Sequence, residues 1–127
     1  MESIKKRILI IEDNEILINT MQFILMKEGY ELLLAKTGKE GLDLIEKNKI
    51  DLLITDLALP YANGIEIIDR LRKQNSVNFN IPIIIVSGYR DDNTIVEGFE
   101  VGANDYIKKP VSPSELISRV RLRIGKA

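Results

Sequence analysis

The sequence has no cysteine and no histidine among its 127 residues. Without cysteine the chain can form no disulfide and offers no thiolate nucleophile or thiolate metal ligand, which fits a reducing compartment. Without histidine it cannot run a Ser-His-Asp mechanism, use an imidazole base or carry a phosphohistidine of its own. Any chemistry must therefore come from other side chains.

Long apolar stretches and an excess of one charge are also missing. No apolar run approaches the ~20 residues of a membrane span, and residues 1–7 contain no signal-peptide core. Basic and acidic residues number 18 and 19, so nothing global argues for binding to nucleic acid or to an anionic membrane. A hydrophobic fraction of 45% suits one compact domain, residues 1–127, which we expect to be soluble and cytoplasmic.

Short apolar runs along the chain have the composition of strands that are buried on both faces. One of them is rich in Leu and Ile, ends at Asp56 and is soon followed by Pro60. Such runs are typical of parallel sheets covered by helices. We expect strands at residues 7–11, 30–35, 50–56, 81–86 and 104–108.

Helical patterns alternate with these runs. Thr37 is placed as an N-cap, and Pro113 lies near the first position of the last helix. We expect the fourth helix to bury Ile95, Val96 and Phe99. The expected helices cover residues 14–28 and 37–48, begin again near 65, cover 91–102 and begin again at 112, and residues 74–80 form a polar connection. This alternation predicts an α/β fold, a doubly wound parallel sheet with right-handed crossovers.

The carboxyl ends of all strands in such a sheet lie along one edge, so residues that are distant in sequence meet there. Glu12 and Asp13 end the first strand and Asp56 the third, while Ser87 ends the fourth and Lys109 follows the fifth. Three crowded carboxylates repel one another unless a cation neutralises them. A hard divalent ion with oxygen ligands, such as Mg²⁺, is the economical solution.

The hydroxyl and the ammonium group of this set indicate what the aspartate could carry. Lys109 and Ser87 would direct a positive charge and a hydrogen-bond donor at a phosphoryl group on Asp56. Phosphoryl transfer depends mainly on positioning and charge neutralisation, and an aspartyl phosphate is a known covalent intermediate. The residues thus predict a phosphoryl-accepting aspartate. The alternative for a lone aspartate at a strand end is that Asp56 only caps a turn or the next helix.

Four motifs in order along the chain resemble those of one family. They are the acidic pair 12–13, the run 56–60 with Gly64 beyond it, Ser87-Gly88, and the run 105–110. With these motifs the whole chain resembles the CheY-like receiver domain of two-component response regulators. The resemblance implies a flavodoxin-like fold with strand order 2-1-3-4-5. It also implies that a histidine kinase or a histidine phosphotransfer domain donates a phosphoryl group to Asp56.

The resemblance implies a role for each residue at the site. Asp13 and Asp56 would bind Mg²⁺ through their side chains, Ala58 through its backbone carbonyl, and Glu12 mainly through water. Ser87 and Lys109 would contact the phosphoryl oxygens.

Lys109 is chosen over Lys108 because it directly precedes Pro110, and the family implies a cis peptide bond there. Lys108 would then point to solvent on the alternate face of the strand. Tyr106 is the expected switch residue, whose ring turns inward behind Ser87. Its alternative role is that of an ordinary strand aromatic packed on the last helix.

Two positions predict a long-lived phosphoryl group. Ala58 and Tyr89, which in the family flank the path of the hydrolytic water, carry no carboxylate or amide to orient it. An unpositioned water loses the advantage of orientation. We expect slow self-dephosphorylation and no enzymatic turnover beyond it.

The resemblance also implies an output surface on the fourth helix, the fifth strand and the fifth helix. Asp105, Glu115 and Arg119 lie there and could form reciprocal ion pairs in a two-fold homodimer, although plain surface charge is the alternative. We expect no contact of this domain with nucleic acid or membrane. A kinase would dock on the first helix beside Asp13, where Ile16 and Ile18 are otherwise core or neutral surface.

Two rival functions remain open from the sequence. A Mg²⁺-dependent phosphatase or phosphotransferase could use Asp56 on the same general fold, but it would need a second acid where the chain has Ala58. A degenerate pseudo-receiver that only binds a partner is disfavoured because all the charged site positions are present.

Overall fold

The computed structural model describes residues 5–73, 77–88 and 92–127. Its centre is a parallel five-stranded sheet in the order β2-β1-β3-β6-β7. These five are the predicted strands, so the flavodoxin-like order 2-1-3-4-5 is confirmed. Their bounds are β1 (Arg7–Ile11), β2 (Glu31–Ala35), β3 (Leu52–Thr55), β6 (Ile83–Ser87) and β7 (Asp105–Lys108).

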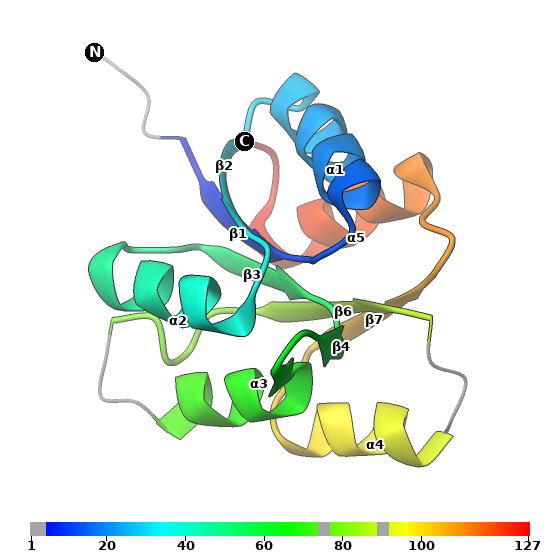
Figure 1. Cartoon of the computed structure of the whole chain (residues 1–127). Coiled ribbons are helices and arrows are strands. Elements are labelled where there is room, and N and C mark those ends of the chain that lie inside the picture. Colours follow the sequence, from blue (N-terminus) through cyan, green and yellow to red (C-terminus); the bar gives the residue numbers. More distant parts are fainter. Residues whose placement is uncertain (1–4, 74–76, 89–91) are drawn as a thin grey trace.

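Five helices cover the sheet from both sides. Helices α1 and α5 lie on one face, and α2, α3 and α4 lie on the other (Figure 1). The helices are α1 (Glu15–Lys27), α2 (Gly38–Lys47), α3 (Gly64–Lys73), α4 (Asp92–Glu100) and α5 (Pro113–Ile124). None of the helices in the described ranges is long and apolar enough to cross a membrane.

The core consists of two apolar clusters, one on each face of the sheet. Along β1, Leu9 and Ile11 belong to the cluster under α2 and α3. Ile8 and Ile10 belong to the cluster under α1 and α5. Side chains alternate between the faces of a strand, so a strand that is covered on both faces needs an unbroken apolar run. This requirement explains the apolar runs of the sequence.

Side-chain caps fix where three of the helices begin. Asn14 accepts a hydrogen bond from Leu17 N, and Thr37 caps α2 as predicted. Ser112 caps α5, with Pro113 at the start of that helix. Each cap satisfies a backbone N–H that has no partner inside the helix. Three helices therefore start directly beside strand carboxyl ends.

The prediction for the buried side of α4 is wrong for Val96 and Phe99. Val96 is 51% exposed and Phe99 is 43% exposed, whereas Ile95 is half-buried. Among residues 93–100 of this helix the buried one is Gly98, where an added Cβ would lie 2.7 Å from Ile85 Cδ1. The helix packs through a glycine, which a search for apolar periodicity cannot detect.

A small hairpin follows Asp56, where only a loop was expected. It pairs β4 (Ala58–Leu59) with β5 (Ala62–Asn63) in antiparallel fashion. Tyr61 in its turn has a φ of 58°, the left-handed region that non-glycine residues seldom adopt. The hairpin joins the end of β3 to the start of α3, so it forms part of the rim around Asp56.

Candidate functional site

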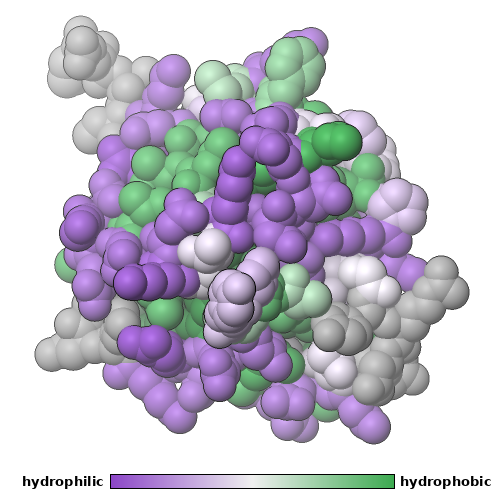
Figure 2. Space-filling view, viewed as in Figure 1, coloured by the Kyte–Doolittle hydropathy of each residue, from purple (hydrophilic) through white to green (hydrophobic). Residues whose placement is uncertain are grey.

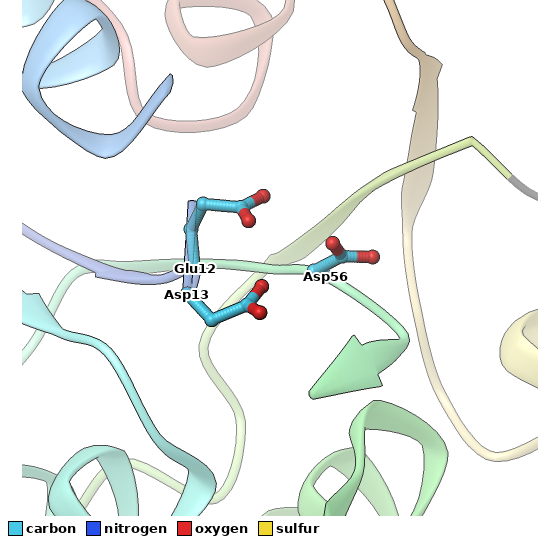
Figure 3. A group of neighbouring side chains, drawn as sticks. All are labelled: Glu12, Asp13 and Asp56. Carbon is cyan, nitrogen blue, oxygen red and sulfur yellow. The ribbon is translucent and has the colours of Figure 1, made fainter. Parts of the chain in front are cut away.

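Three carboxylates meet at the carboxyl edge of the sheet, as the sequence predicts. Glu12 and Asp13 follow β1 and point toward Asp56, which follows β3 (Figure 3). One oxygen of each residue lies within 4.8 Å of the others. Glu12 and Asp56 are buried, whereas Asp13 is exposed. The cluster therefore combines two fixed acids with one that solvent can reach.

The two oxygens of Asp56 have different partners. Oδ1 accepts hydrogen bonds from the backbone N–H of Leu57 at 2.6 Å and of Ala58 at 3.2 Å. Oδ2 accepts one from Lys109 Nζ at 2.7 Å. Asp56 thus does cap its own turn, as the alternative interpretation had it, but with only one oxygen. The other oxygen faces the rest of the site.

The backbone of Asp56 is held in place by the start of α3. At Gly64 an added Cβ would lie 2.1 Å from the carbonyl oxygen of Asp56, and Gly64 N donates to Leu57 O. Only glycine permits so close an approach of two backbones. Sequence reasoning named Gly64 as a motif residue but missed this contact and the two N–H donors to Oδ1. The Asp-turn chemistry of the sequence was the available signal for those donors.

Lys109 supplies the positive charge of the site. Its Nζ lies 2.9 Å from Glu12 Oε1 as well as 2.7 Å from Asp56 Oδ2. The peptide bond to Pro110 is cis, and Lys108 is exposed, both as predicted. Burial lowers the pKa of Lys109, but its contacts with Asp56 and Glu12 outweigh this, so the pKa lies above its ordinary value. Lys109 therefore carries its positive charge between two buried acids at neutral pH.

Burial changes the pKa of Glu12. Burial raises its pKa above the ordinary value, and the charge of Asp56 adds to this. A hydrogen bond from Asn14 N and the neighbouring Lys109 act in the opposite direction but do not cancel the shift. A buried acid of this kind favours an additional positive charge beside it.

A cavity of about 310 Å³ opens beside Asp56, lined by Asp56, Ala58, Ser87, Gly88 and Lys109. The predicted acceptor, hydroxyl and ammonium groups therefore border one space. Ser87 is buried at the end of β6. The geometric prediction that these residues meet agrees with the structure.

Tyr106 lies behind Ser87. Its hydroxyl donates to the carbonyl oxygen of Ser87 over 3.2 Å, and its half-buried ring packs on the α2 and α3 side of the sheet. The alternative role, an aromatic packed on the last helix, is wrong because α5 covers the opposite face. Burial raises the pKa of Tyr106, and the charge of Asp56 raises it further. The charge of Asp56 thus acts on the hydroxyl group of Tyr106.

The donor set fits a hard divalent cation. All three side chains offer oxygen, which is what Mg²⁺ prefers. Glu12 Oε1 is buried and, within the described residues, accepts no well-oriented hydrogen bond. The carbonyl of Ala58 remains a predicted ligand, with Ala58 lining the same cavity. Tyr89, the other residue predicted to flank the hydrolytic water, lies outside the described residues.

The interpretation of Asp105 as surface charge is wrong. Asp105 is only 6% exposed, and its Oδ1 lies 2.7 Å from Nη1 of Arg119 in the same chain. Arg119 also lies 3.4 Å from Glu115. Asp105 stands at the first position of β7, where its side chain meets α5, so the motif alone gave no sign of its burial.

Comparison with known proteins agrees with this geometry. The family model for the response regulator receiver domain matches residues 8–121. The chain is 36% identical over 116 residues to the alkaline phosphatase synthesis transcriptional regulatory protein PhoP of Bacillus subtilis, covering 91% of the chain and 47% of PhoP. The chain spans about half the length of the curated relatives it matches.

Solved structures give the same result. A CheY-like receiver domain protein from Methanospirillum hungatei superposes with a TM-score of 0.88 at 34% identity, over 94% of this chain and 93% of that one. The receiver domain of the sensor histidine kinase PA1611 from Pseudomonas aeruginosa has a TM-score of 0.87 at 25% identity, over 97% of this chain and 100% of that one. That structure has a magnesium ion coordinated in its active site cleft. The chain belongs to the response regulator receiver domain family.

Proposed function

We propose that Asp56 accepts a phosphoryl group from a histidine kinase or a histidine phosphotransfer domain. The observation that carries this proposal is that the two carboxylate oxygens of Asp56 have different partners. Oδ1 is held by two backbone N–H groups, while Oδ2 faces Lys109 beside a cavity that Ser87 also lines. Oδ2 attacks the phosphorus, the bond to the donor's histidine nitrogen breaks, and its electron pair stays on the imidazole.

Four residues would hold Mg²⁺ during this step. Asp13 and Asp56 would bind it through their carboxylates, Ala58 through its carbonyl and Glu12 through water. When bound, the ion neutralises charge on the phosphoryl oxygens. The oxygen cluster of this chain and the magnesium ion in the PA1611 receiver domain support this assignment.

After transfer, the phosphoryl group would recruit the cationic side of the site. Lys109 would exchange its contact with Asp56 Oδ2 for one with the phosphoryl oxygens, and Ser87 would donate to them. Tyr106, bonded to Ser87 O, would turn further inward as the loop after β6 moves. The population would thus shift toward a second arrangement of the α4, β7 and α5 surface, which would control a partner or an output domain.

Two surfaces would meet other proteins. On α1, Ile18 is core but Ile16 is 80% exposed, and a phosphodonor would dock there beside Asp13. A homodimer through α4, β7 and α5 would require Arg119 to exchange its partners Asp105 and Glu115 within the chain for those of a second copy.

We place this domain in the cytoplasm, as the cysteine-free sequence favours, and assign it no turnover beyond slow loss of its own phosphoryl group.

Incubation with Mg²⁺ and acetyl phosphate, followed by intact mass measurement, tests the proposed function. One retained phosphoryl group is expected on the native chain and none on Asp56→Asn. Asp51→Asn is the matched control, because Asp51 lies at the opposite end of β3 and accepts from Arg7 N. Release of inorganic phosphate without a retained adduct would identify a phosphatase, and no reaction at all would identify a pseudo-receiver.

A further inference from the structure

A second hollow lies outside the phosphoacceptor site, between α2 and α3. It has a volume of about 500 Å³, and the β4–β5 hairpin closes one end of it. Its floor is apolar, formed by Leu42, Ala62 and Ile67. Helix α2 lies close to both the hairpin and α3 at Gly38, where an added Cβ would lie 2.8 Å from Ala62 Cβ on β5 and 2.9 Å from Ile67 Cδ1 on α3.

The walls of this groove carry charges of both signs. They are Lys39, Asp43 and Glu46 on α2, and Glu66 and Arg70 on α3, all of them exposed. Figure 2 shows hydrophilic side chains over this side of the molecule with smaller apolar areas between them.

Within the described residues, none of these five wall charges takes part in an ion pair. Lys39 and Asp43 are four residues apart on one helix, and so are Glu66 and Arg70, yet across the described residues neither pair comes within 4.0 Å. The next such pair on α3, Asp69 and Lys73, does form, with a separation of 3.0 Å. As far as the described part of the chain shows, the wall charges can therefore pair with a partner.

The wall charges of each helix are complementary to those of the same helix running in the opposite direction. We propose that the groove binds a second copy of this chain around a two-fold axis perpendicular to the helices. Each helix then faces its own copy in the antiparallel direction, so Lys39 faces Glu46 of the second copy and Glu66 faces Arg70 of the second copy. The symmetry forms each pair twice, and Asp43 near the axis is the one charge that faces its like. This inference does not depend on phosphorylation of Asp56.

Tyr61 supplies the contact that surface ion pairs alone cannot. Its ring is fully exposed, and its backbone is held at a φ of 58° in the turn that closes the groove. A bulky residue in that conformation is strained, and such strain is concentrated at binding sites. In the reversed copy the ring reaches the far end of the facing groove, where Arg70 of the second copy can stack on it.

Sedimentation equilibrium of the native chain and of charge-swap variants tests the proposal. The native chain should dimerise weakly, with a Kd on the order of 100 μM, because exposed ion pairs contribute little each. Lys39→Glu and Glu46→Lys should each weaken the dimer about tenfold, since each turns two attractions into two repulsions. The double variant restores opposite charges with reversed sign, so its Kd should return to near the native value. High salt should weaken the native dimer.

Two further variants separate the groove from other surfaces and from folding. Tyr61→Gly relieves the backbone strain, so it should keep or raise the melting temperature while weakening the dimer. Val96→Ser, on exposed α4, should leave the dimer unchanged. A native chain that stays monomeric up to about 1 mM, a double variant as weak as the single ones, or loss of the dimer in Val96→Ser alone would each overturn the proposal.

Discussion

At Glu12, burial and the charge of Lys109 shift the pKa of the carboxyl group in opposite directions. Its pKa is raised in the folded chain, chiefly by burial, although Lys109 lies 2.9 Å away. A buried acid with a raised pKa stabilises the fold in its neutral form, and this contribution is lost as the pH rises through the folded pKa. Because Glu12 lies at the proposed metal site, this pH dependence of stability should be measurable only while the site holds no divalent ion.

The variant Glu12→Gln fixes the neutral form and makes this testable. In EDTA, its free energy of unfolding should gain on that of the native chain as the pH rises from about 4 to 7. The comparison is made by urea unfolding at each pH. Glu40→Gln is the control, because Glu40 is exposed in the first turn of α2. A difference between Glu12→Gln and the native chain that does not change with pH would contradict the raised pKa.

The side chain at Ala58 should affect how long a phosphoryl group stays on Asp56. It borders the cavity beside Asp56 and carries no polar group to orient an attacking water. In Ala58→Asn the added amide should position that water, so the phosphoryl group should decay faster, by about tenfold or more. Decay of the labelled aspartyl phosphate, followed with Mg²⁺ present after the phosphodonor has been removed, measures this. Ala58→Val adds bulk without an amide and should not accelerate the loss, and an unchanged lifetime in the asparagine variant would count against the interpretation.

At the scale of elements, Asn78 shows how a segment without regular structure can organise its neighbours. It is completely buried, donates to Ile45 O and Asn48 O and accepts from Ile50 N. It therefore ties the end of α2 to the chain entering β3. Residues 77–80 of the predicted polar connection thus contain a core residue.

Replacement of Asn78 by alanine should expose this role. The change leaves buried backbone donors and acceptors unpaired, so the free energy of unfolding should fall by about 2–4 kcal/mol. Urea unfolding monitored by circular dichroism measures the loss. Asn80→Ala in the same connection, at an exposed position, should change stability by less than about 0.5 kcal/mol. Equal effects of the two replacements would show that Asn78 is not the organising residue.

The elements also show what the sequence can and cannot reveal. Apolar runs predict the sheet because a sheet covered on both faces must bury them. Strand-end residues predict the meeting of Asp13, Asp56 and Lys109 because the carboxyl ends of parallel strands lie along one edge. Gly98 and Asn78 escaped prediction, since their packing depends on a neighbour that is distant in sequence. Periodicity reports the preference of one segment, and it contains no information on the surface that the segment will meet.

At the scale of the whole molecule, the two edges of the sheet have different tasks. Away from the acidic edge, long-range hydrogen bonds fasten the chain: Tyr30 OH donates to Gly125 O, and Arg72 donates to the carbonyl of Gly102 and to Asn104. The carboxyl edge instead gathers charges that repel one another. These hydrogen bonds lie away from the site, so the site can change its contacts without breaking them.

This separation makes the response to Mg²⁺ a property of the whole fold. Ions that bind only the folded chain stabilise it by mass action, by about 1.4 kcal/mol when their free concentration is ten times the Kd. For a domain of this size the melting temperature should rise by several degrees in calorimetry, relative to EDTA. Asp13→Asn should lose most of the rise, and because Asp13 is exposed the variant should still fold. Asp43→Asn, an acid of the α2–α3 groove, should respond like the native chain. A native chain that Mg²⁺ leaves unchanged, or a response that survives in Asp13→Asn, would remove the metal from the site, since neither outcome is compatible with carboxylates that an ion holds together.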